Sequence, residues 1–349
     1  MVINLSLERF DGFYLSELVK PAKPLTDRLI GETTMFLRQF EYLIALEKEG
    51  HFGRAAERCH VSQPSLSSAL QQLEAELDVP IILRHQRYQG FTPEGERVVS
   101  WAKRLLADKK SMIEELAIMR SNLNGRLRIG AMPTSSPILP KINQLFSTLY
   151  PSVEVDIQFL GSDKLINELR NFELDVGITY LEGSSLNKLN TMALYEEQLS
   201  LMIPEHMLPA DQTSISWAQA SELRLGLLSP NMGERGVMDE AFQNVGQSPS
   251  PSLECNSIFQ LAFHVMQGDI ATIVPNGFSK TNDAFPGTRE ISLVDPVLSK
   301  PVGLIWEKVV PPLPMAQAMA DLLLESREEI FSALGKSEKP KAQKRKKVA

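Results

Sequence analysis

The chain has 349 residues, of which 43% are hydrophobic and 23% charged, with a formal net charge of −7. This is the composition of a globular protein of two or three domains; it contains no apolar run long enough to cross a membrane and no secretory start, so a cytoplasmic location is expected. The two cysteines, Cys59 and Cys255, cannot form a disulfide framework, and the histidines show no four-ligand spacing, so neither a metal nor another cofactor is expected.

Residues 1–34 precede the first periodic segment and contain Pro21 and Pro24 with few regularly spaced apolar residues. Two interpretations stay open for them. They form a poorly ordered extension, or the start of the protein is mis-assigned and Met35 is its natural beginning.

The next segment predicts three helices. Apolar residues at helical spacing predict a helix over 36–48, and Ala55 and Ala56 mark a short second helix with a closely packed face. Ser62 is a suitable N-cap for a third helix, in which Leu66, Leu70, Leu73 and Leu77 form the buried stripe. This order is typical of a helix-turn-helix, whose second helix enters the DNA major groove. The residues expected at that DNA contact are Ser62, Gln63, Pro64, Ser65, Ser67, Ser68 and Gln71.

Residues 81–95 contain two short strand-like stretches around a polar turn, as in a β-hairpin wing. Arg84 and Arg87 are expected near the phosphate backbone; the alternative for each arginine is a solvated surface charge. Because the segment 35–95 carries no excess of positive charge, binding has to depend on the placement of a few groups.

Residues 96–124 contain no Gly or Pro before Gly125 and predict a long helix. Its apolar residues follow a heptad pattern that Lys109 interrupts and that continues to Leu123. A seam of this regularity predicts a partner helix, although an amphipathic helix packed on its own domain would show similar spacing. The residues expected at the dimer interface are Val98, Ala102, Leu105, Met112, Leu116 and Met119.

The remaining sequence alternates strands and helices. Strands are expected at 127–132, 153–159 and 174–180, separated by helices at about 137–149 and 164–171. Further strands are expected at 199–203, 224–228, 271–274 and 302–306. The βαβαβ order predicts a largely parallel sheet covered by helices.

The pattern from Ala55 through Ser67, followed by Leu73-Glu74, Arg84 and Thr92-Pro93-x-Gly95, resembles the LysR-type transcriptional regulators. The resemblance covers about residues 36–330 and departs from the family pattern at Ser68, where a basic residue is frequent, and at Cys59, where Leu is usual. It implies an α+β protein: an N-terminal winged helix-turn-helix, a long linker helix that pairs two subunits, and a C-terminal two-lobed α/β effector domain like the periplasmic binding proteins.

The expected domains follow from this resemblance. They are the DNA-binding domain at 35–95, the linker helix at 96–124 and the effector domain at 125–331. Lobe I would comprise about 125–197 and 301–331, and lobe II about 198–300. The tail, 332–349, is rich in lysine and expected to be disordered; a DNA-binding arm and a solubilising tail both fit it.

An effector is expected beyond the carboxyl ends of the strands. The candidates are Thr134, Ser135, Ser136, Ser162, Thr179, Asn231, Arg235, Asn256 and Pro275. Amides and hydroxyls at Thr134 and Ser135, which the resemblance favours, would suit a small organic effector such as a carboxylate. Each residue could instead serve only as a cap or turn.

These features predict a sequence-specific DNA-binding transcriptional regulator that is controlled by a small-molecule effector. Its expected partners are double-stranded DNA, further copies of itself in a homodimer or homotetramer, and RNA polymerase. No nucleophile elbow, phosphate loop or metal motif suggests an enzyme. Two alternatives remain: a thiol-redox-responsive regulator using Cys255, and a solute-binding protein without regulatory DNA contacts.

Overall fold

The computed structural model describes residues 35–84, 88–120, 123–279 and 284–332. The chain divides into two compact units, Met1–Ala102 and Lys103–Ala349. Within the described ranges, no helix has both the length and the apolar character needed to cross a membrane. The expectations for residues 1–34, for Arg87 and for 333–349 fall outside the described residues.

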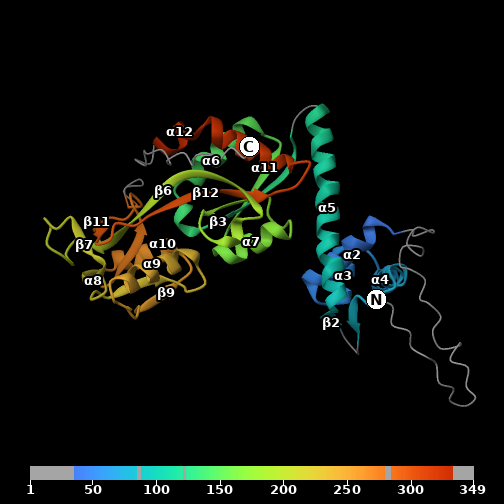
Figure 1. Ribbon diagram of the computed structural model, residues 1–349, viewed down its shortest axis with the longest axis horizontal. Coiled ribbons are helices and arrows are strands. Elements are labelled where there is room, and N and C mark those ends of the chain that lie inside the picture. Colours follow the sequence, from blue (N-terminus) through green and yellow to red (C-terminus); the bar gives the residue numbers. More distant parts are fainter. Residues whose placement is uncertain (1–34, 85–87, 121–122, 280–283, 333–349) are drawn as a thin grey trace, which may run out of the picture. The chain divides into compact units, whose positions relative to one another are not determined.

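In its described residues, the first unit has the expected three helices and pair of antiparallel strands, followed by the start of α5 (Figure 1). Its elements are α2 (Leu37–Glu49), α3 (Phe52–Arg58), α4 (Gln63–Leu77), β1 (Ile82–Arg84), β2 (Tyr88–Phe91) and the first part of α5 (Pro93–Arg120). Leu66, Leu70 and Leu73 of the predicted stripe are buried, and they pack in a core with Phe40 and Leu43. The apolar spacing therefore identified the inward faces of α2 and α4.

The long helix begins earlier than predicted. Residues 93–95 belong to α5 rather than to the wing, because Thr92 caps the helix: its Oγ1 accepts a hydrogen bond from the N–H of Gly95 at 2.8 Å and donates to the carbonyl of Pro80 at 2.6 Å. Gly95 also packs against β1, since a Cβ there would lie 2.1 Å from the carbonyl oxygen of Ile81. Pro93 is tolerated because its position in the first turn needs no N–H donor.

The helix also ends earlier than predicted. The described part of α5 stops at Arg120. Leu123, expected at the end of the heptad seam, is instead buried in the core of the second unit. Its apolar character reflects that core rather than a contact between helices.

The second unit contains two lobes of strands and helices. Its strands are β3 (Gly125–Ala131), β4 (Val153–Phe159), β5 (Val176–Tyr180), β6 (Leu189–Pro204), β7 (Ser214–Ser216), β8 (Leu225–Leu228), β9 (Leu253–Cys255), β10 (Ala271–Pro275), β11 (Thr288–Val294) and β12 (Ser299–Glu307). Its helices after α5 are η2 (Pro133–Ser135), α6 (Leu139–Leu149), α7 (Ser162–Arg170), η3 (Ser184–Leu186), α8 (Trp217–Ala220), α9 (Gly233–Asn244), α10 (Ile258–Met266), α11 (Pro314–Glu325) and α12 (Arg327–Ser332).

One long strand, β6, runs from one lobe into the other. In the described residues the main strand order is β4-β3-β5-β12-β6-β10-β8-β9. Residues 189–198 of β6 pair with β12, and residues 199–204 pair with β10 and β11 (Figure 1). The first half of β6 therefore belongs to lobe I and the second half to lobe II, and separate hydrophobic cores lie on the two sides.

The expectation of a largely parallel sheet is only partly correct. β3 pairs in parallel with β4 and β5, and β8 pairs in parallel with β9 and β10. The pairs that involve β6 or β12 are antiparallel. Hydrophobic periodicity identifies a strand but does not give its direction, which here depends on the path of the chain between the lobes.

Candidate functional site

The predicted recognition face of α4 lies open to solvent. Gln63, Pro64, Ser65, Ser68 and Gln71 are exposed. The hydroxyl of Ser62, itself exposed, accepts a hydrogen bond from the N–H of Ser65 at 3.3 Å and so caps the helix, while Ser67 is half-buried. The first turn has no acidic side chain, so its positive helix end is not neutralised locally. This face offers hydroxyl and amide groups to phosphates and base edges.

Nearby cations on α3 are paired within the protein. Arg58 lies 3.0 Å from the carboxylate of Glu49, and Arg54 lies 3.7 Å from the other oxygen of that group. Arg84 is the last residue of β1. Arg54 and Arg58 of α3 therefore add no strong unpaired positive charge to the described surface near α4.

The second half of α5 carries an exposed apolar strip. Met112, Leu116 and Met119 of the predicted seam are 56%, 47% and 77% exposed, and Ile113 and Ile118 widen the strip. Val98 and Leu105 are half-buried. Ala102 was expected at the dimer interface, but its small side chain is fully buried within a single chain, so that expectation is wrong.

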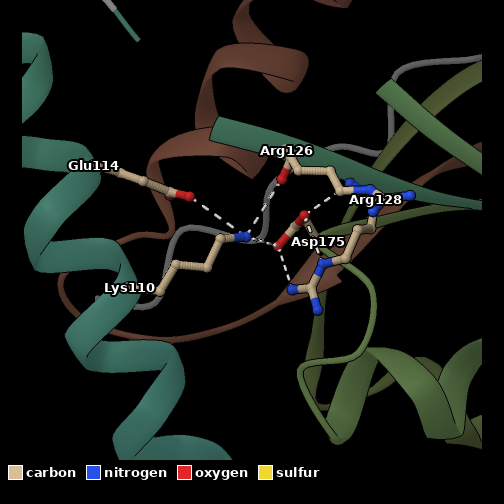
Figure 2. A network of polar contacts seen from close by, with 5 residues as sticks. All are labelled: Lys110, Glu114, Arg126, Arg128 and Asp175. Atoms are coloured by element: carbon tan, nitrogen blue, oxygen red, sulfur yellow. Dashed lines mark hydrogen bonds and ion pairs between the residues drawn. The ribbon is translucent and has the colours of Figure 1, made fainter. Parts of the chain in front are cut away.

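A buried ion-pair network fixes α5 to the start of the effector unit (Figure 2). Asp175, just before β5, accepts hydrogen bonds from Lys110 at 3.1 Å and from the guanidinium of Arg128 at 2.7 and 3.1 Å. Burial alone would raise the pKa of Asp175, but Arg128 and Lys110 hold it below its usual value. Burial raises the pKa of Glu114, which lies 3.4 Å from Lys110. One carboxylate thus joins α5 to β3 and to the loop before β5.

The loop after β3 is less available to a ligand than predicted. The N–H groups of Ser135 and Ser136 donate to the carbonyls of Met132 and Pro133 in a 3-10 turn, and both hydroxyls donate to those same two carbonyls. The helix α6 begins only at Leu139, so the loop does not lead directly into its first turn. Ser135 and Ser136 therefore serve as turn residues in this state.

Other predicted residues fall on both sides of the contact between the lobes. The hydroxyls of Ser162 and Thr179 lie 3.0 Å apart, at the start of α7 and near the end of β5. Asn231 and Asn256 are exposed, and Pro275 is buried at the end of β10. Ser162 and Thr179 are thus brought together, whereas Asn256 has no described contact with them.

Arg235 is not a free counter-charge for an anion. It is 8% exposed, and its guanidinium bonds Asp239 at 2.8 Å, Glu254 at 2.7 Å and the carbonyl of Leu228 at 2.8 Å. These contacts neutralise its charge and tie α9 to β8 and β9 within lobe II. Arg235 was expected to bind an anionic effector or to be a solvated charge, and both expectations are wrong.

The two lobes touch through two glycines that allow backbone to approach. A Cβ on Gly161 would lie 2.2 Å from the carbonyl oxygen of Asn231, and one on Gly233 would lie 2.2 Å from the hydroxyl of Ser162. Gly161 and Ser162 belong to lobe I, and Asn231 and Gly233 to lobe II. Small residues at these positions let the lobes close without an intervening side chain.

Beside this contact lies a carboxyl group that the sequence did not single out. Glu234, in the first turn of α9, is fully buried, and its Oε1 accepts hydrogen bonds from the N–H and hydroxyl of Thr134 at 3.3 and 3.5 Å. Burial, together with the nearby charge of Glu197, raises its pKa from 4.5 to about 7, although the hydrogen bonds from Thr134 oppose the shift. In sequence, an acidic residue in a first helical turn usually indicates a solvated helix end.

Glu197 is a second buried acid in the same region. It lies on β6 where the strand passes from lobe I to lobe II, and its carboxylate accepts hydrogen bonds from Tyr180 at 2.6 Å and Tyr195 at 3.4 Å. Burial and the charge of Glu197 raise the pKa of both tyrosines well above the usual value. In sequence, Glu197 stands in the polar run Glu196–Gln198 and shows no sign of being buried.

Comparison with known proteins agrees with this architecture. A family model described as "Bacterial regulatory helix-turn-helix protein, lysR family" matches residues 37–96, and "LysR substrate binding domain" matches residues 120–328. A hydrogen peroxide-inducible genes activator of Dickeya chrysanthemi is 30% identical over 69% of this chain and 79% of its own length. The DNA-binding transcriptional dual regulator OxyR of Escherichia coli is 28% identical over 78% of this chain and 89% of its own length.

Solved structures show the same fold. A full-length OxyR variant from Pseudomonas aeruginosa covers 88% of this chain and 100% of its own, with 28% identity and a TM-score of 0.68. Full-length CbnR in complex with its target DNA covers 84% of this chain and 100% of its own, with 22% identity and a TM-score of 0.60. Together with the family matches over both units, these comparisons show that the chain belongs to the LysR family and is a DNA-binding transcriptional regulator.

Proposed function

We propose that this regulator reads its operator with the exposed polar face of α4 and joins two copies through the apolar strip on α5. The observation that carries the proposal is the exposed face of α4 between Gln63 and Gln71, which presents amides and hydroxyls but no charge. Such a face gives little electrostatic affinity by itself. Two copies on one DNA would compensate, with their recognition helices about 34 Å apart on a two-fold-symmetric site.

The test begins with genome-wide mapping of bound DNA, followed by titration of a mapped fragment with purified full-length protein. Gln63→Ala and Ser65→Ala should each weaken operator binding by about 1–3 kcal/mol while changing nonspecific binding much less. Gln144→Ala, at an exposed position of α6, is the matched control. Wild-type operator affinity in both α4 variants would contradict the proposed recognition face.

We further propose that a small molecule binding between the lobes alters the DNA complex. The contact of Gly161 with Asn231 and the passage of β6 between the lobes support this, because a ligand entering there would part that contact about β6. A ligand can shift the arrangement of the lobes only if it binds one arrangement more tightly than the other. A footprint that changes with ligand would support effector control, and identical footprints over a broad screen would count against it.

A thiol-redox response is a second candidate, favoured by the peroxide-inducible activators among the relatives. The chain offers one cysteine to each unit, Cys59 and Cys255, so no disulfide can form within either unit. A redox response would therefore depend on oxidation of Cys255 alone or on a bond between units or copies. Cys255→Ser with unchanged peroxide-dependent regulation would dispose of this candidate.

A further inference from the structure

The predicted anion site in the cleft is already occupied by the protein's own carboxyl group. Thr134 alone among the three polar residues of the loop after β3 directs both its N–H and its hydroxyl across to the other lobe. Both groups meet Oε1 of Glu234. A carboxylate effector would have to displace Glu234 from these contacts before it could bind there.

The second oxygen of Glu234 is available for a different kind of partner. Oε2 is buried and has no hydrogen-bond partner among the described residues. The described residues also provide no ion pair to Glu234, since the adjacent Arg235 is engaged with Asp239 and Glu254. An unsatisfied buried oxygen of this kind destabilises the fold, and more so when it is charged, so a donor that reached it would be strongly favoured.

The surroundings of Glu234 oppose a second negative charge. Glu197 faces it from β6, and Tyr180 and Tyr195 lie close enough for their own pKa values to be raised by Glu234. With a pKa of about 7, the carboxyl of Glu234 can lose its proton near neutral pH when a cation arrives. A positively charged group would then form a buried, hydrogen-bonded ion pair, whereas an acid would add to the repulsion.

We infer that the effector is cationic and places a protonated amine or amidine against Oε2 of Glu234. This inference rests on the proposed control by a small molecule between the lobes. Thr134 holds Oε1 and thereby orients the carboxylate toward the incoming group. Entry requires the contact between Gly161 and Asn231 to part by movement about β6. The expected chemistry therefore differs from the carboxylate that the sequence suggested.

The test compares charge-matched probes on the full-length protein at constant ionic strength. Thermal unfolding is measured with n-butylamine, 1,4-diaminobutane and agmatine, and with butyrate and butanamide as the acidic and neutral counterparts. Wild type, Glu234→Gln and Glu240→Gln are compared; Glu240 is an exposed acid on the same helix, so its variant controls for the loss of one charge. A ligand that binds only the folded state raises the unfolding temperature.

We expect at least one amine to stabilise wild type and Glu240→Gln, with at least tenfold weaker binding to Glu234→Gln. Its affinity should rise between pH 6 and pH 8, because binding releases the proton of Glu234. No stabilisation by any amine, equal stabilisation of Glu234→Gln, or stabilisation by butyrate alone would overturn the inference. Operator binding by the same preparations without probe separates the cationic-effector inference from the proposed function. Selective DNA binding without amine binding overturns only the inference about the effector. Loss of selective DNA binding overturns the proposed function.

Discussion

Replacing Glu234 by glutamine should remove a pH-dependent loss of stability from the effector unit. The carboxyl pKa rises from 4.5 to about 7 on folding, chiefly because the group is fully buried. A raised carboxyl pKa means that the folded state holds its proton more tightly than the unfolded state. The stability it contributes is thus fully present below about pH 4.5 and is lost as pH rises through about 7.

The size of this effect follows from the difference between the two pKa values. At about 1.4 kcal/mol per pH unit, the full loss is roughly 3 kcal/mol, of which roughly 2.5 kcal/mol falls between pH 5 and pH 8. The amide of Glu234→Gln cannot ionise and keeps nearly the same shape. The variant should therefore gain stability relative to wild type steadily over that range.

The assay is urea unfolding of the full-length protein at pH 5, 6, 7 and 8. Fluorescence of Trp217, which is fully buried in lobe II, reports the transition when Trp101 and Trp306 are replaced by Phe in every protein compared. Taking the difference between variant and wild type cancels the other titrating groups. A stability difference that stays constant with pH, or the same slope in Glu240→Gln, would refute the reasoning about Glu234.

Three further predictions concern other parts of the chain. Leu116→Asp should weaken operator binding at least tenfold and reduce self-association in sedimentation, because it places a charge on the exposed apolar strip of α5. Unimpaired operator affinity would argue against pairing of two copies through this strip. Asp175→Asn should lower the free energy of unfolding in urea by about 3 kcal/mol near pH 7, because it breaks the ion pair with Arg128. The stability difference from wild type should shrink in acid, where wild-type Asp175, whose pKa is held low, also becomes protonated. A difference that does not change with pH would contradict this. Gly161→Ala should lower stability by about 1–3 kcal/mol, because the added methyl meets the carbonyl of Asn231. Gly236→Ala is the control, since open space surrounds that position. Equal thermal midpoints for the two variants would show that the lobes are not closed at the contact of Gly161 with Asn231.

The sequence was most informative where one element determines its own environment. The stripe of Leu66, Leu70 and Leu73 predicted which face of α4 is buried, and Ser62 predicted where the helix begins. The strand over 153–159 is also confirmed, with the same bounds as β4. In each case the signal is local, since helical or strand periodicity and capping depend on neighbours within a few residues.

The candidate cleft was predicted less well, because its residues come together only through folding. Thr134 follows β3 and Thr179 lies near the end of β5, as expected, and both are buried, but the serines beside Thr134 are used by their own turn. Arg235 looked like a ligand for an anion and is instead bound by two carboxylates. Which partner a polar side chain finds depends on distant segments, and a sequence pattern does not contain that information.

By itself, the sequence determined the winged helix-turn-helix, the long helix and the alternation of strands and helices, because each depends on short-range spacing of apolar, capping and turn residues. Only the tertiary structure decided that β6 runs from one lobe into the other and that Glu197 and Glu234 are buried near each other. These two acids are 37 positions apart and look like ordinary surface charges in the sequence. The raised pKa of Glu234 arises from loss of water and from the nearby charge of Glu197, and both effects appear only once the chain has folded around it.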